Sequence, residues 1–164
     1  MGLATLAYLG LGANLGDPIQ QLIDARRAIF DWHLSANGRS SYFYTSSPVG
    51  DTQQNEYINC ALAIQVDASP HALLAFCQTL ELRLGRQRDS NNRNAARSID
   101  IDILAIPGLS VNEATLQIPH PRMNERLFVL LPLLEVAEEP YAKSLRYCIE
   151  TGDFSGQAIH RLAV

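Results

Sequence analysis

Two aspartates, Asp100 and Asp102, alternate with isoleucines in the apolar segment 98–106. In a β-strand, residues i and i+2 lie on the same face, about 6.6 Å apart. Two carboxylates on one face of a buried strand repel each other and lose hydration, and a cation bound between them offsets both costs. Carboxylate oxygens suit Mg²⁺, which takes water and phosphate oxygens as its other ligands, and such a pair can hold two ions. The pattern therefore favours a magnesium site over a solvent-facing strand with two ordinary aspartates.

Arginines are concentrated immediately before these aspartates. Five fall within fifteen residues, at Arg83, Arg86, Arg88, Arg93 and Arg97, although the formal net charge of the chain is −4. Planar guanidinium groups bind phosphate oxygens in a bidentate manner. A cationic loop beside a magnesium-binding strand is typical of phosphoryl transfer, which depends on positioning and on charge neutralisation. Without the aspartates, a solvated charged loop would be the better interpretation.

Two smaller groups of residues could also contact a substrate. His120 is held between two prolines in a polar segment, so it could donate to a phosphate together with Arg126, although a structural histidine is an equally good interpretation. Tyr57 and Asn59 share one face of a predicted strand, where the ring could stack on a flat heterocycle and the amide could pair with its edge. A tyrosine in the core is the commoner explanation of that pattern.

The glycine-rich run 10–16 resembles a dinucleotide-binding fingerprint only superficially. Three residues separate its last two glycines where the fingerprint has two, and no ribose-binding acid follows convincingly. A tight turn from a strand into a helix, with a glycine at positive φ, is the preferred interpretation.

Periodicity and end signals predict the elements that position these residues. Strands are expected at 3–12, 39–46, 57–66 and 98–106, and helices at 18–32, from 69–70 to Gly85, and at 127–136 despite Pro132. The order β-α-β-β-α-β predicts an α+β fold, a ferredoxin-like sandwich with one antiparallel sheet, helices on a face and additional C-terminal helices. The tail from Pro140 gives no decided pattern.

Composition limits the class of protein. A chain of 164 residues is expected to form one domain over 1–164, and 47% apolar residues suffice for a core. The acidic net charge argues against nucleic-acid and anionic-membrane partners, and no apolar run is long enough to span a membrane. The N-terminus has no basic region typical of a secretory signal, and three widely spaced cysteines fit buried thiols in a reducing compartment. A soluble cytoplasmic protein is therefore expected.

Six blocks, in order, resemble the 6-hydroxymethyl-7,8-dihydropterin pyrophosphokinase family, an enzyme family of folate synthesis. The blocks are residues 8–16, 47–50, 57–61, 81–86, 96–104 and 119–130. The last two are the most specific, and the likeness extends over about residues 8–134. Departures are Ala96, where many members have proline, a missing loop tryptophan, and Asn124 in place of a commoner histidine.

The resemblance implies transfer of a pyrophosphoryl group from ATP to the pterin hydroxymethyl oxygen, with release of AMP. It places Asp100 and Asp102 at two Mg²⁺ ions, and Arg86 and Arg97 at the transferring phosphates. The implied nucleotide contacts are Gln78, Glu81, Arg88, Ile103, His120 and Arg126. The implied pterin contacts are Tyr57, Asn59 and Phe128, with the edge of the pterin held by Ser46, Ser47, Pro48 and Val49.

The alternative is a non-catalytic ferredoxin-like module that binds a small molecule, or an inactive paralogue of the enzyme. A simple module needs neither the aspartate pair nor the arginine loop. The expected partners are ATP and the pterin, with no nucleic acid and no membrane, and the expected state is a monomer.

Overall fold

The computed structural model describes residues 4–47, 55–85 and 98–163. Within these ranges the strands are β1 (Thr5–Ala13), β2 (Ser35–Ser40), β3 (Tyr44–Ser46), β4 (Tyr57–Val66), β5 (Asp100–Ala105), β6 (Val111–Asn112), β7 (Gln117–Ile118) and β8 (Ile159–Arg161). The helices are α1 (Pro18–Phe30), α2 (Pro70–Arg83), α3 (Leu127–Val136) and α4 (Tyr141–Thr151), and Met123–Glu125 form a 3₁₀ turn. The predicted strand 57–66 and helix 127–136 have the predicted bounds.

The main sheet is antiparallel, as predicted. Its strand order is β5-β1-β4-β3-β8, and β2 also pairs with β4. β1 therefore lies between β4 and β5 and is antiparallel to both. A second, two-stranded sheet is formed by the short hairpin of β6 and β7.

The single strand expected at 39–46 is divided in the structure. β2 and β3 pair with successive parts of β4, and residues 41–43 between them are not strand. At the break, the Ser41 hydroxyl accepts a 2.9 Å hydrogen bond from the N–H of Ala61. The Ser41 N–H donates in turn to the Ala61 carbonyl, also at 2.9 Å. A side chain thus replaces a backbone acceptor, and the chain bends there.

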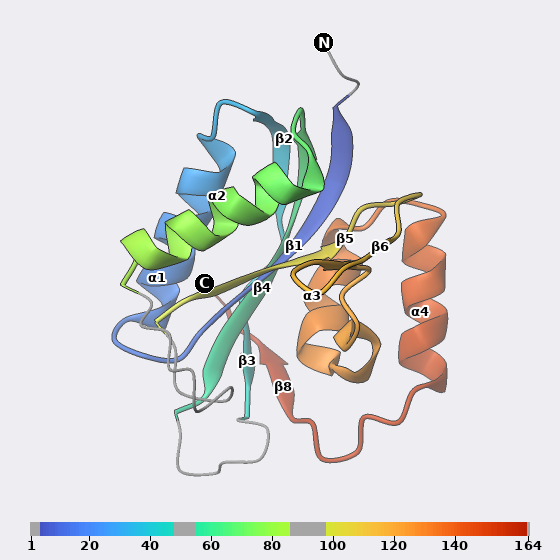
Figure 1. Ribbon diagram of the computed structural model, residues 1–164. Helices are drawn as coiled ribbons and strands as arrows, with labels where there is room; N and C mark the ends of the chain where they lie inside the picture. Colours follow the sequence, from blue (N-terminus) through green and yellow to red (C-terminus); the bar gives the residue numbers. More distant parts are fainter. Residues whose placement is uncertain (1–3, 48–54, 86–97, 164) are drawn as a thin grey trace.

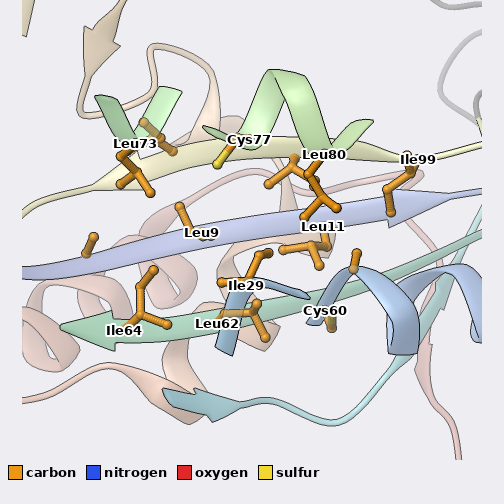
Figure 2. Close-up of a cluster of buried hydrophobic side chains, with 14 of the residues drawn as sticks. Leu9, Leu11, Ile29, Cys60, Leu62, Ile64, Leu73, Cys77, Leu80 and Ile99 are labelled. Carbon is orange, nitrogen blue, oxygen red and sulfur yellow. The ribbon is translucent and has the colours of Figure 1, made fainter. Parts of the chain in front are cut away.

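Helices α1 and α2 cover one face of the sheet (Figure 1). Each begins as its sequence predicts, because the side chains of Asp17 and Ser69 accept hydrogen bonds from backbone N–H groups of the first turn and a proline follows each cap. Figure 2 shows the core between these layers. Its buried members come chiefly from β1, β4, β5, α1 and α2 and include Leu9, Leu11, Ile29, Leu62, Ile64, Leu73 and Leu80.

Helices α3 and α4 cover the opposite face, so the sheet lies between two helical layers rather than under one (Figure 1). A second core holds Tyr8 and Leu104 of the sheet against Leu130, Leu133 and Leu145 of these helices. Pro132 is buried inside α3. Since proline has no N–H, it cannot donate the usual hydrogen bond to the Phe128 carbonyl one turn earlier.

Two of the three cysteines are buried, as predicted. Cys60 and Cys77 are free thiols in the interior, and burial raises the pKa of each to about 12. Cys148 is partly exposed. Among the helices of the described ranges, none is both long and apolar enough to cross a membrane.

Candidate active site

The two aspartates lie beside glycines on one face of the sheet. In the β1–β5 pair, Asp100 is opposite Gly12 and Asp102 is opposite Gly10. Directly opposed residues of antiparallel strands point to the same face. Because glycine has no side chain, β1 places no side chain of its own beside either carboxylate, and the Leu104 side chain packs over Gly10. The period-two arrangement predicted for the aspartates is therefore present, and Gly10 and Gly12 belong to the strand rather than to a turn. Only Gly16 of this run has the positive φ expected for the turn, at 65°.

Asn59 lies across Gly12 from Asp100. The β1–β4 pair places Gly12 opposite Asn59, so Asp100, Gly12 and Asn59 form one row across three strands. Asn59 is 5% exposed, and its Nδ2 donates a 2.9 Å hydrogen bond to the Ser46 hydroxyl. The Oδ1 atom lies over Gly12, 3.1 Å from the position that a Cβ there would occupy. The amide oxygen is thus turned toward the aspartate side of the row.

Tyr57 and Ser46 lie beside this row, at the start of β4. They are directly opposed in the β3–β4 pair, and Tyr44 is opposite Asn59 in the same pair. Ser46 is buried, whereas Tyr57 is partly buried and Ser47 is exposed. Three of the predicted pterin residues, Tyr57, Asn59 and Ser46, are therefore neighbours on the face that carries the aspartates.

His120 approaches the second aspartate. Its Nε2 atom is 4.0 Å from Oδ2 of Asp102. The backbone N–H of His120 donates to the Leu104 carbonyl at 2.8 Å, and its Nδ1 accepts from the Arg122 N–H at 3.2 Å. A ring that accepts at Nδ1 carries its proton on Nε2 when neutral. Burial and the nearby Arg126 lower the pKa of His120, against an opposite effect of Asp100, which favours this neutral donor.

Arg126 brings positive charge to the same place. Burial lowers the pKa of Arg126, and Asp102 and Asp100 act in the opposite direction, so both aspartates are close enough to interact with it. Its guanidinium carbon lies 5.7 Å from the centre of the Phe128 ring in the first turn of α3. Arg126, at the end of the 3₁₀ turn, and Phe128, in the first turn of α3, are therefore neighbours, and both were predicted site residues.

Glu81 supports the aspartate strand from α2. It is 2% exposed, and its Oε1 accepts a 2.7 Å hydrogen bond from the N–H of Ile101, between the two aspartates. Gln78, one turn earlier on α2, is partly buried. Contact of Gln78 and Glu81 with a nucleotide stays a prediction.

A cavity of about 230 Å³ opens beside β5. It lies between β5, Leu74 of α2 and the β6–β7 hairpin, with His120 in its wall. The lining residues are Leu74, Ile101, Asp102, Ile103, Ala114, Thr115, Leu116, Gln117, His120 and Pro121. Because β5 ends the described strand order, the cavity reaches around it to Ile103 on the opposite face from Asp102. Its volume is below that of pockets that enclose a whole ligand, so it suits one part of a larger molecule.

Some predicted residues cannot be placed. Pro48, Val49, Arg86, Arg88 and Arg97 lie outside the described residues. Reasoning from sequence also missed that Gly10 and Gly12 lie beside the two aspartates in the sheet. Their period-two spacing in a strand was a usable signal. It missed the cavity residues of the hairpin as well, and no local pattern marks them.

The aspartate pair suits a metal that takes few protein ligands. Within the described ranges, no group of three or more histidine, cysteine or acidic side chains could hold a metal ion. Mg²⁺ is commonly held by one or two carboxylates, with water and substrate phosphates as its other ligands. The side chain of Asp102 is 41% exposed, so it can reach such a ligand.

A carboxylate pair beside a small cavity, with a histidine and an arginine nearby, is an arrangement suited to an enzyme that acts on a nucleotide phosphate. Comparison with known proteins is consistent with this class. Residues 8–138 match the family described as 7,8-dihydro-6-hydroxymethylpterin-pyrophosphokinase. The chain belongs to this family, as its sequence blocks predicted.

Curated relatives agree over most of the chain. A 2-amino-4-hydroxy-6-hydroxymethyldihydropteridine pyrophosphokinase of Methylorubrum extorquens is 41% identical over 140 residues, covering 82% of this chain and 84% of the relative. Proteins with the same name from Haemophilus influenzae and Bacillus subtilis are 37% and 36% identical, over 81% and 82% of this chain and 82% and 79% of the relatives.

Proposed function

We propose that the row Asp100–Gly12–Asn59 is the centre of the reaction that family membership gives this chain. The chain is an ATP-dependent pyrophosphokinase, which transfers a pyrophosphate group from ATP to 6-hydroxymethyl-7,8-dihydropterin in folate biosynthesis. The observation that carries the proposal is the register of the sheet, which sets a carboxylate and a buried amide on the two sides of a residue without a side chain. A substrate that lies over Gly12 contacts both.

Asp100 and Asp102 are the proposed ligands of two Mg²⁺ ions. When bound, the ions neutralise phosphate charge and lower the pKa of the attacking hydroxyl, so no protein base is required. Asp100 and Asp102 would hold the ions on the β5 side of the site, and the hydrogen bond from Ile101 to Glu81 fixes the strand between them. The exposed side of Asp102 leaves room for phosphate oxygens.

The pterin is proposed to lie over Gly12. Because Nδ2 of Asn59 is bonded to Ser46, its Oδ1 is the atom turned toward the ring and accepts from a pterin N–H. Tyr57 and Phe128 are the proposed stacking partners. Ser46, Ser47, Pro48 and Val49 are proposed to contact the edge of the ring. A closely fitted aromatic and amide pair selects a flat heterocycle with donors along one edge.

ATP is proposed to place its base in the cavity beside β5 and its phosphates toward Asp102. Ile103 and Leu74 supply apolar walls, and the Nε2–H of His120 faces the phosphate path. Arg126 is the proposed cation there, joined by Arg86, Arg88 and Arg97, while Gln78 and Glu81 complete the nucleotide contacts. Guanidinium groups at this position balance the charge that builds up on the transferring phosphates.

We also propose a ferredoxin-like arrangement in a single domain that acts as a monomer. The order β5-β1-β4 followed by β2 or β3, with α1 and α2 on one face, supports the ferredoxin-like part. The additional helices α3 and α4 cover the other face.

One experiment separates this enzyme from a binding module or an inactive paralogue. Purified protein is given ATP, Mg²⁺ and 6-hydroxymethyl-7,8-dihydropterin, and AMP is quantified with and without the pterin. Pterin-dependent AMP release is expected, and it should disappear in Asp100→Asn. Equal AMP release by the two proteins would contradict the assigned centre.

A further inference from the structure

Gln157 bonds to the backbone on both sides of Arg126. Its Nε2 donates to the Glu125 carbonyl, and its Oε1 accepts from the Leu127 N–H, both at 2.8 Å. The first N–H groups of a helix have no partners within the helix. Arg126, at the N-cap of α3, makes no capping hydrogen bond with its own side chain. Gln157 therefore supplies that cap from a distant part of the chain.

The residues after Gln157 reach the other side of the proposed pterin site. The Ala158 carbonyl accepts from the Ser47 N–H at 3.4 Å, and Ile159 in β8 is directly opposite Ser46 in β3. Three consecutive residues, 157–159, thus contact both the Ser46–Ser47 segment and the start of α3. They lie after residue 138, where the match to the family ends.

We infer that Gln157 is a positioning residue for the pyrophosphokinase reaction. This inference rests on the proposed function, because Arg126 and Phe128 matter only if they contact substrate. Two hydrogen bonds from one amide fix the backbone around Arg126, and Phe128 follows in the first turn of α3. The Arg126 guanidinium and the Phe128 ring are neighbours, so loosening this backbone displaces a nucleotide contact and a pterin contact together.

The test compares Gln157→Met, Gln157→Glu and the control Gln20→Ala with the wild-type chain. Methionine keeps the length of the side chain and loses both hydrogen bonds. Glutamate keeps the acceptor for Leu127 and loses the donor for Glu125. Gln20 is an exposed glutamine of α1 whose side chain bonds to Asp24, so its loss removes one surface contact away from the site.

Gln157→Met is expected to weaken the binding of ATP with Mg²⁺ and of the pterin, each roughly 3- to 30-fold, as measured by calorimetry. KM should rise more than kcat falls, and Gln157→Glu should lie between methionine and wild type. Hydrogen exchange at the Leu127 amide should become about 10-fold faster in Gln157→Met. A merely structural role would lower the melting temperature without these changes, and Gln20→Ala should match the wild type throughout.

The inference is overturned if the folded Gln157→Met protein binds both substrates within about twofold of the wild type. If Gln157→Met does not fold, Gln157→Glu decides in the same way. Asp100→Asn is measured in parallel. If Asp100→Asn is inactive and the Gln157 variants behave as wild type, only this inference is refuted, whereas an active Asp100→Asn refutes the proposed centre itself.

Discussion

The Glu81 carboxylate accepts a 2.7 Å hydrogen bond from the backbone N–H of Ile101. Glu81 belongs to α2 and is 2% exposed, whereas Ile101 lies between the two aspartates of β5. Burying a carboxylate is unfavourable unless it is hydrogen-bonded, and a charged acceptor strengthens such a bond. The backbone between Asp100 and Asp102 is therefore held by a side chain from a different layer of the fold.

Removing that acceptor should destabilise the fold. Glu81→Ala leaves the buried Ile101 N–H without this partner, and we expect a loss of about 1–3 kcal/mol in the free energy of unfolding. Glu81→Gln keeps a carbonyl acceptor and should lose less. Urea denaturation measures both, with the exposed Glu150→Ala as control. An unchanged unfolding free energy for Glu81→Ala would show that the bond contributes nothing.

Neutralising either aspartate should stop the reaction without unfolding the chain. Asp100→Asn and Asp102→Asn keep the shape of the side chain but remove the charge that would hold Mg²⁺. Turnover should nearly vanish, and the magnesium-dependent part of ATP binding should weaken. Asp67→Asn, an exposed aspartate in the turn after β4, makes the same charge change elsewhere and should be active. Near-normal activity of either site variant would refute the metal assignment.

Asn59 should affect the affinity for the pterin but not the affinity for ATP. Asn59→Ala removes the acceptor over Gly12 and leaves the pterin edge unpaired, at a cost of roughly 1–3 kcal/mol in binding free energy. The dissociation constant of ATP should change little. Titration calorimetry with each ligand separately measures both values. Gln65→Ala is the control, since the Gln65 amide bonds to Asn37 on an exposed part of the sheet. Unchanged pterin binding would exclude Asn59 from the pocket.

The two glycines of β1 should respond differently to a methyl group. In Gly12→Ala the new Cβ lies 3.1 Å from Oδ1 of Asn59, so the amide must move. In Gly10→Ala it meets the flexible end of Leu104, also at 3.1 Å, which can adjust. We expect about a tenfold loss of pterin affinity for Gly12→Ala, equivalent to one lost hydrogen bond. Gly10→Ala should bind the pterin with an affinity close to that of the wild type. A larger loss of affinity in Gly10→Ala than in Gly12→Ala would contradict the row Asp100–Gly12–Asn59.

Tyr44 should make stability depend on alkaline pH. Its hydroxyl donates to Glu135 of α3, and burial, together with that carboxylate, raises the pKa of Tyr44 to about 12. The Tyr44 phenol of the unfolded chain ionises at about pH 10. The free energy that the protonated phenol contributes to folding is therefore complete below that pH and is lost as the pH rises from about 10 to about 12. Thermal melts should fall less steeply with pH over this window in Tyr44→Phe than in wild type. Parallel slopes would mean that the phenol titrates normally.

Local patterns predicted the elements that carry the site, but not how distant elements meet. Strand β4 followed from a segment that is apolar on both faces, the aspartates of β5 from period two, and the starts of α1 and α2 from Asp17-Pro18 and Ser69-Pro70. The break between β2 and β3 was missed because it depends on a hydroxyl bond from Ser41 to a strand that comes later in the chain.

In the candidate site, too, local patterns predicted single residues but not the contacts between distant elements. The cavity needs the β6–β7 hairpin to lie near α2, which no local pattern encodes. The hydrogen bond from Ile101 to Glu81 was not predicted, although Glu81 follows Cys77 by four residues on the buried stripe of α2 and a carboxylate there requires a partner. The polar tail after Pro140 gave no decided periodicity, although it forms α4 and β8.

The position of β5 at the end of the described strand order also bears on self-association. The outer backbone of such a strand is a template on which another chain can add a strand, and charged side chains are a common protection against this. In β5 the chain itself also covers part of this backbone, because the N–H of Ile101 donates to Glu81 and the carbonyl of Leu104 accepts from the N–H of His120. These contacts oppose the addition of a strand, so loss of the Glu81 acceptor should favour edge-to-edge association of the protein.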